Sequence, residues 1–279
     1  MPVNLMWLGR MSIMNNQEKL DDIFKKLTVG YKKLNKDQIA FAIKEISRVR
    51  GDLADILADY AGKDGVIKKQ RLSRLLRELD EVEVLIREYG TTAMDAIIRD
   101  SAVFASTGIN VGLAAIGAKV VAQMERLNRD VFEYVVKRFG EDGLVLSDRV
   151  WRLSGDMRDN LSKVIRTDIL KGESVSTMIA NIRRVHENET WKIKRLVVTE
   201  GNTAYRTATA MNASRSEVVT ALRVHRGLAN RPEHRCTQLE KLDRYGMGPG
   251  LYPPTDQEIY KMHVSCTGFL TYELNEDYL

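Results

Sequence analysis

The sequence predicts a mainly α-helical protein, with an N-terminal heptad helical hairpin and a helical body followed by a small C-terminal α+β domain. The chain of 279 residues contains only 19 glycines and 5 prolines, and such low counts favour helices over turn-rich β structure. Apolar residues recur at helical spacing over most of the chain and at the two-residue period of a strand only near its end. We expect three regions: residues 1–145 with the hairpin at about 36–89, a helical core at 146–213, and the α+β domain at 214–279.

The hairpin is predicted from two runs of apolar residues on either side of a glycine-containing break at 61–65. The first run alternates at spacings of four and three residues, with Arg50 at the one missing position: Ile39, Ile43, Ile46, Leu53, Leu57 and Tyr60. The second run ends before Gly90: Leu72, Leu75, Leu79, Val82, Ile86 and Tyr89. Two heptad helices joined by so short a turn fold back on each other as an antiparallel pair. The alternative is that residues 36–89 pair with a second copy as a dimerising coiled coil.

Five further helices are expected between residues 101 and 213. The segment 101–122 is the most apolar part of the chain, and its glycines indicate a buried helix with close backbone packing. A second helix carries one apolar stripe: Leu127, Val131, Val135 and Phe139. The third begins at a cap on Ser147 and ends at Gly172. Ser174 caps the fourth helix, and Thr190 opens the fifth.

One carboxylate falls on the apolar stripe of the last of these helices. Glu200 lies between Val197 and Ala204 at helical spacing. A buried carboxylate is costly unless it is paired. We therefore expect an arginine or several backbone N–H groups to meet Glu200, as a buried structural carboxylate.

The end of the chain changes from helical to strand periodicity. Apolar residues alternate over 218–225 and again over 269–274, which predicts two strands. A turn-rich loop between them contains the glycines at 246, 248 and 250 and two consecutive prolines. These features together predict the small α+β domain.

Positive charge is concentrated between residues 151 and 250. The net charge is +5, but residues 151–250 hold 18 Lys and Arg against 11 Asp and Glu. Clustered cations attract DNA or an acidic protein surface, and a solvated basic face is the alternative. The residues expected to make such contacts are Arg215, Arg223, Arg226, Arg231 and Arg235. The apolar piece at 6–9 is too short to span a membrane, so no membrane partner is expected, and the absence of a Gly-x-x-x-x-Gly-Lys-Ser/Thr loop argues against a P-loop ATPase.

Sulfur and imidazole groups are concentrated near the C-terminus. They form two pairs on either side of the turn-rich loop: His234 with Cys236, and His263 with Cys266. Two histidines and two cysteines can complete a tetrahedral zinc shell, and zinc would stabilise a loop-rich domain with little core. The alternatives are ordinary packing and hydrogen bonding, or a disulfide, which a reducing compartment disfavours. No other cofactor is expected.

The order of segments from residue 146 onward resembles the Mu F-like minor head protein family of tailed bacteriophages, also called head morphogenesis proteins. Four segments carry the resemblance: 146–182 with a Gly-x-Ser break at 172–174, 195–213 with Thr199, Glu200 and Ala204, 231–240 with Arg231 and His234, and 262–274 with His263 and Cys266. Departures are Val198 in place of an arginine, Val264 in place of a proline, and Thr267-Gly268 in place of Arg-Cys. Because of the first departure, an arginine partner for Glu200 must come from elsewhere in the chain.

The resemblance implies a non-enzymatic structural protein of a phage head. It would be found in the host cytoplasm during assembly and then in the virion, inside the head near the portal. Its partners would be the portal protein, the major capsid or scaffolding protein, and double-stranded DNA bound without sequence preference. The heptad arm lies outside the resemblance.

A metal-dependent nuclease or other hydrolase is the alternative function. It would use the C-terminal His/Cys cluster as metal ligands, with Glu233 as the general base. A cluster of four ligands leaves no coordination position for water, which favours the structural protein.

Overall fold

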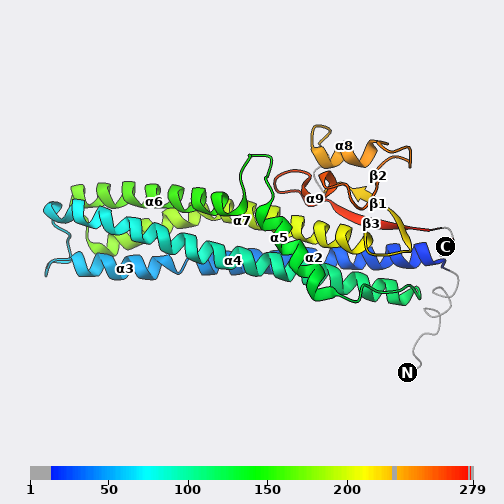
Figure 1. Ribbon diagram of the computed structural model, residues 1–279. Helices are drawn as coiled ribbons and strands as arrows, with labels where there is room; N and C mark the ends of the chain where they lie inside the picture. The colour runs from blue at the N-terminus through cyan, green and yellow to red at the C-terminus, as the bar shows by residue number, and fades with distance from the viewer. Residues whose placement is uncertain (1–13, 228–230, 276, 278–279) are drawn as a thin grey trace, which may run out of the picture. The chain divides into compact units, whose positions relative to one another are not determined.

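The computed structural model describes residues 14–227, 231–275 and 277, and it confirms the predicted fold class (Figure 1). The apolar piece at 6–9 lies outside these residues. The longer helices are α2 (Asn16–Ile46), α3 (Val49–Tyr60), α4 (Leu72–Ala115), α5 (Met124–Lys137), α6 (Leu146–Lys171) and α7 (Val175–Ala213). Near the C-terminus lie β1 (Val219–His225), α8 (Arg235–Lys241), β2 (Leu251–Tyr252), α9 (Glu258–Lys261) and β3 (Phe269–Leu274). Among the helices described, none combines the length and the apolar character that crossing a membrane requires.

The chain folds into two compact units that each combine segments distant in sequence. The sheet unit comprises Met1–Lys36, Ile97–Glu141 and Val198–Leu279, and the hairpin unit comprises Asp37–Ala96 and Asp142–Val197. Helices α2, α4 and α7 each contribute to both units. The division predicted from the sequence is linear, whereas these units are built from interleaved segments.

The predicted antiparallel hairpin is present in the hairpin unit as α3 and the first part of α4. The Tyr60 hydroxyl donates a hydrogen bond to Glu78 (2.9 Å), and the Tyr89 hydroxyl donates one to Asp52 (3.2 Å). The first pair joins the end of α3 to the beginning of α4. The second pair joins the beginning of α3 to a later part of α4, as an antiparallel arrangement requires.

The register predicted for the first arm is wrong at its centre. Helix α2 ends at Ile46, and a turn at 47–48 separates it from α3. Val49 is buried, whereas Arg50 at the predicted core position is only half-buried.

Helix α4 continues through Gly90, where the sequence predicts an end. A Cβ atom at this position would lie 3.1 Å from Cγ1 of Val150 in α6, so the glycine allows close packing rather than stopping the helix. Further along α4, a Cβ atom on Gly108 would collide with Leu27, and one on Gly112 would lie 3.1 Å from Ile23. These contacts confirm the close packing predicted for 101–122, although α4 itself ends at Ala115.

The helix ends predicted around Gly172 are confirmed, whereas the helix starts predicted at Ser147 and Thr190 are wrong. Gly172 terminates α6 with φ 75°, and the Ser174 hydroxyl accepts a hydrogen bond from the Thr177 amide (3.2 Å). Ser147 lies inside α6, where Asp148 instead accepts from the Val145 amide (3.3 Å). Thr190 does not begin a helix, because α7 runs unbroken past it and its hydroxyl bonds to the Glu187 carbonyl within that helix (2.8 Å).

The sheet is antiparallel, with strand order β2-β1-β3. Both predicted strands are confirmed, and Leu222 of β1 pairs with Tyr252 and Tyr272 on its two sides. Gln17 of α2 caps the outer edge of β3 by donating to the Tyr272 carbonyl (2.8 Å) and accepting from the Leu274 amide (2.9 Å). This contact fixes the sheet on the helices of its own unit.

His186 is buried in the hairpin unit, although its charged sequence neighbours suggest a solvated side chain. It is 4% exposed, and its Nε2 lies 3.3 Å from the Ser47 hydroxyl. Burial, together with the charge of Arg50, lowers the pKa of His186 from 6.5 to about 4. The folded chain therefore holds this imidazole neutral at pH values where the unfolded chain protonates it.

This shift predicts a loss of stability in acid. The neutral His186 imidazole contributes fully to the unfolding free energy above pH 6.5, which is the ordinary pKa of histidine. This contribution is lost as the pH falls toward the folded-state pKa of about 4. Between neutral pH and pH 4.5 we expect the wild type to lose about 1–2 kcal/mol more unfolding free energy than His186→Gln. Urea denaturation of both proteins at the two pH values measures this difference, and equal losses would contradict it.

Candidate metal centre

Glu200 has the arginine partner that its burial requires. Nη2 of Arg138 lies 2.8 Å from Oε2 of Glu200, and the two side chains are 4% and 0% exposed. Arg138 follows directly after α5, three residues beyond the buried Val135 on the same apolar stripe. That spacing was the available sequence signal for this residue, and it was missed. The pair joins the end of α5 to α7 inside the sheet unit.

A second buried arginine on α7 holds the loop that precedes β3. Arg206 is 1% exposed and donates hydrogen bonds to the carbonyl oxygens of Tyr260 (2.8 Å), Cys266 (3.2 Å) and Gly268 (3.0 Å). Arg206 was not among the predicted site residues. Its signal was its position as the one charged residue in the otherwise uncharged stretch 201–213.

The structure brings three of the four predicted metal ligands together. Candidate ligand atoms of His234, Cys236 and His263 all lie within 4.8 Å of one another. Nε2 of His263 is 3.1 Å from Sγ of Cys236, and the two imidazole rings have centroids 4.7 Å apart. The fourth, Cys266, is buried and outside this group of three; its thiol donates to Sδ of Met262 (3.7 Å), and it influences the pKa of the Cys236 thiol. The three clustered ligands lie between the start of α8 and the loop before β3.

Hydrogen bonds set the protonation of this cluster. The Cys266 thiol and the His263 imidazole hold the pKa of the Cys236 thiol well below its usual range. The hydrogen bond to Cys236 raises the pKa of His263, while the same thiol contact and burial raise the pKa of Cys266. Cys236 is thus thiolate-like beside a proton-holding imidazole. A Cys–His pair of this kind can act as a nucleophile, but Cys236 is 1% exposed, so a substrate cannot reach its sulfur.

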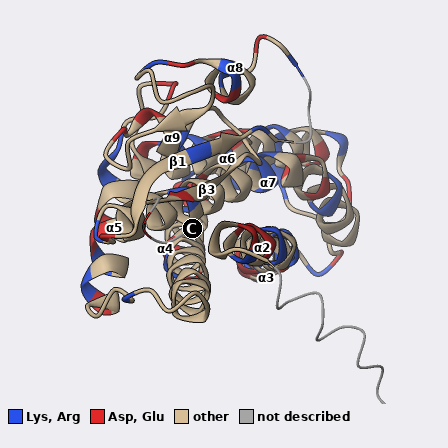
Figure 2. Ribbon diagram, turned by 90° about the vertical axis from the view of Figure 1, so that its right-hand side faces the viewer, with Lys and Arg blue, Asp and Glu red and all other residues tan. Residues whose placement is uncertain are grey.

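The arginines predicted to contact DNA or an acidic partner are mostly engaged within the chain. Lys/Arg and Asp/Glu are interspersed along the same elements (Figure 2). Four ion pairs involve these residues: Arg215 with Asp130 (2.5 Å), Arg223 with Glu273 (2.6 Å), Arg226 with Glu240 (3.2 Å), and Arg235 with Glu258. Arg231 is exposed in the segment before α8. Pairing with in-chain carboxylates reduces the attraction that the first four can exert on phosphate.

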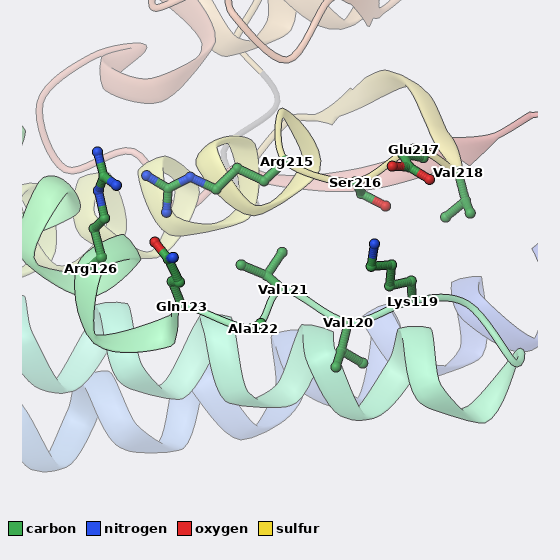
Figure 3. A pocket seen from close by; sticks show the side chains of 10 residues that line it. All are labelled: Lys119, Val120, Val121, Ala122, Gln123, Arg126, Arg215, Ser216, Glu217 and Val218. Carbon is green, nitrogen blue, oxygen red and sulfur yellow. The ribbon is translucent and has the colours of Figure 1, made fainter.

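A separate cavity in the sheet unit concentrates positive charge. It has a volume of about 440 Å³ and lies between the connection from α4 to α5 and the connection from α7 to β1. Figure 3 shows Arg126 and Arg215 lining one end and Lys119 the other, where Glu217 also lies. Arg215 is paired with Asp130, which leaves Lys119 and Arg126 as the further cations of this cavity against the carboxylate of Glu217. These two residues are better candidates for contact with an anion than the paired arginines.

Comparison with known protein families, with curated proteins and with solved structures gives no match. The resemblance to the head morphogenesis family therefore rests on the four sequence segments alone.

Proposed function

We propose that this chain is a non-enzymatic head morphogenesis protein of a tailed bacteriophage, which docks on the portal during assembly. The observation that carries the proposal is the convergence of three of the four segments that resemble the family. The Ser265 amide donates to the Thr199 hydroxyl (3.0 Å), which joins the second segment to the fourth. The contact between His263 and Cys236 joins the fourth to the third.

Apart from the exposed Arg231, the polar residues shared with the family pattern in these segments are occupied in holding the sheet unit together. Glu200 is paired with Arg138, and His234 and His263 lie against each other in the His/Cys cluster. Side chains used in this way build a rigid scaffold for docking, whereas catalysis needs groups that face a substrate. The buried Cys236 and the exposed Glu233 also fit the hydrolase alternative poorly.

Exposed apolar side chains on one loop mark the surface that we assign to docking. Leu242, Tyr245 and Met247 lie on the loop between α8 and β2, and they are 40%, 47% and 40% exposed. Exposed large apolar side chains gathered on one loop are typical of protein-interaction sites. The basic cavity with Lys119 and Arg126 supplies the contact to DNA phosphate, which is non-specific and sensitive to salt.

Co-expression of the full chain with the portal protein of the same phage tests this function. We expect the two proteins to co-purify, and the double variant Leu242→Ser/Met247→Ser to reduce recovery of the portal at least about tenfold, as loss of central apolar contacts does. Trp191→Ser is the matched control, because Trp191 is more exposed, at 54%, but lies in the hairpin unit. Failure of the wild type to co-purify would overturn the proposal.

The same preparation tests the DNA contact. Duplex DNA should be retained at low salt and released as salt rises, and Arg126→Glu should weaken retention. Retention that does not change with salt would remove DNA from the partners.

A further inference from the structure

The His/Cys cluster has the donor set of a zinc site. Its ligands come from two separate segments, one at the start of α8 and one in the loop before β3. In a tetrahedral zinc site, the ligand nitrogen and sulfur atoms lie about 3.5 Å apart. The 3.1 Å between Nε2 of His263 and Sγ of Cys236 is already close to that separation. Two imidazoles and two thiols are the combination that favours zinc over the harder cations Mg²⁺ and Ca²⁺.

The contacts around the histidines point to a metal independently of the donor set. Nδ1 of His234 is buried and has no hydrogen-bond partner among the residues that the structure describes. A buried polar atom without a partner is costly, and a metal ion would satisfy it. Nδ1 of His263 lies 2.9 Å from the carbonyl oxygen of Val264. Because a carbonyl can only accept, Nδ1 carries the proton, and Nε2 faces Cys236 as metal-binding histidines do.

Backbone amides also support the sulfur atoms. The Gly268 amide donates to Sγ of Cys266 (3.4 Å), and the Gly227 amide donates to Cys236. Glycine is required at 268, because a Cβ atom there would lie 2.7 Å from the His225 carbonyl and 3.3 Å from Sγ of Cys266. N–H donors aimed at sulfur stabilise thiolates, which are the form of cysteine that binds metal.

We propose that this chain binds one zinc ion through His234, Cys236, His263 and Cys266, as a closed structural site. Binding releases two protons to solvent, one from Cys266 and one from the hydrogen-bonded pair of Cys236 and His263. The four ligands fill the tetrahedral shell, which leaves no position for a reactive water. The ion fastens α8 to the loop before β3, in a part of the sheet unit that has only short helices and a three-stranded sheet. The inference does not depend on docking to a portal.

Metal analysis of the purified full chain tests the proposal. We expect about one zinc ion per chain, and cobalt exchanged into the site should give the visible bands of tetrahedral Co²⁺ with thiolate-to-cobalt charge transfer. Loss of a contact that only supports a ligand weakens metal binding by up to about 100-fold. Cys236→Ser and His263→Ala each remove a ligand, so each should weaken zinc binding by more than this. His225→Ala is the matched control, since His225 belongs to the same unit but bonds to Thr271 on the sheet (2.8 Å).

A second measurement covers variants that fail to fold. Wild-type chain stripped with a chelator is titrated with zinc against a chromogenic competitor, and its thermal midpoint is followed. Binding of one equivalent of zinc, together with a rise in the thermal midpoint of unfolding, supports the site. A folded wild-type chain that takes up neither zinc nor cobalt would overturn the proposal. A disulfide between Cys236 and Cys266 in the purified chain would also overturn it, if reduction of that disulfide restores no metal binding.

Discussion

Replacing Glu200 by leucine is expected to destabilise the chain by about 3–5 kcal/mol. The substitution leaves the guanidinium of Arg138, which is 4% exposed, without the carboxylate that lies 2.8 Å from it. An uncompensated buried charge carries a penalty of this size. Since whole domains are stable by only about 5–15 kcal/mol, the variant should unfold at a much lower denaturant concentration.

The double variant Arg138→Met/Glu200→Leu separates loss of the pair from loss of packing. Replacing both members of a buried pair by apolar residues is often close to neutral, so it should recover most of the stability. Glu133→Gln is the matched control, because Glu133 pairs with Lys137 (3.1 Å) on the exposed face of α5. Removing an exposed pair of this spacing should cost less than about 0.5 kcal/mol. Equal effects at Glu133 and Glu200 would contradict the structural role of Glu200.

Replacing Arg206 by methionine has the second large expected effect. The carbonyls of Tyr260, Cys266 and Gly268 lose their donor, and each buried acceptor left unsatisfied costs about 1–3 kcal/mol. We therefore expect a loss of at least about 3 kcal/mol, measured by denaturant unfolding. Arg206→Lys keeps the charge but cannot reproduce the planar set of N–H donors. Its loss of unfolding free energy should therefore be smaller than that of Arg206→Met but still measurable.

A matched arginine in the same unit controls for loss of charge. Arg223 is 41% exposed and pairs with Glu273 on the sheet. Arg223→Met should change stability by less than about 1 kcal/mol. If it destabilises as much as Arg206→Met, the three carbonyl contacts are not the source of the effect.

Short-range patterns predicted the sheet well. Apolar residues alternate along β1 and β3, as at Leu222 and Val224, and this period is visible in the sequence. Strand β2 escaped prediction because it contains only Leu251 and Tyr252, too few residues for a period to appear. The left-handed backbone at Gly172 ends α6 locally, which is why that boundary could be predicted.

Predictions failed where distant residues decide the local structure. Gly90 stays helical because Val150 packs where a side chain would otherwise stand, and the sequence around Gly90 does not contain that information. The need for a partner at Glu200 could be predicted from burial alone, but the sequence does not show that Arg138, which follows a different helix, is that partner. In the candidate site, the His/Cys residue types could be predicted as ligands. Arg206 was marked only as the one charged residue of 201–213, and its three carbonyl partners lie too far along the chain to be predicted.

Hydrogen exchange of the full chain, compared between wild type and Arg206→Met, tests most directly whether the family-like segments form one interlocked scaffold. Such a scaffold predicts that protection falls together in 234–241 and 258–270, although residue 206 contacts only the second of these, while 49–60 in the hairpin unit keeps its protection. Protection lost beside residue 206 alone, with 234–241 unchanged, would show that the segments fold independently and would contradict the proposed scaffold.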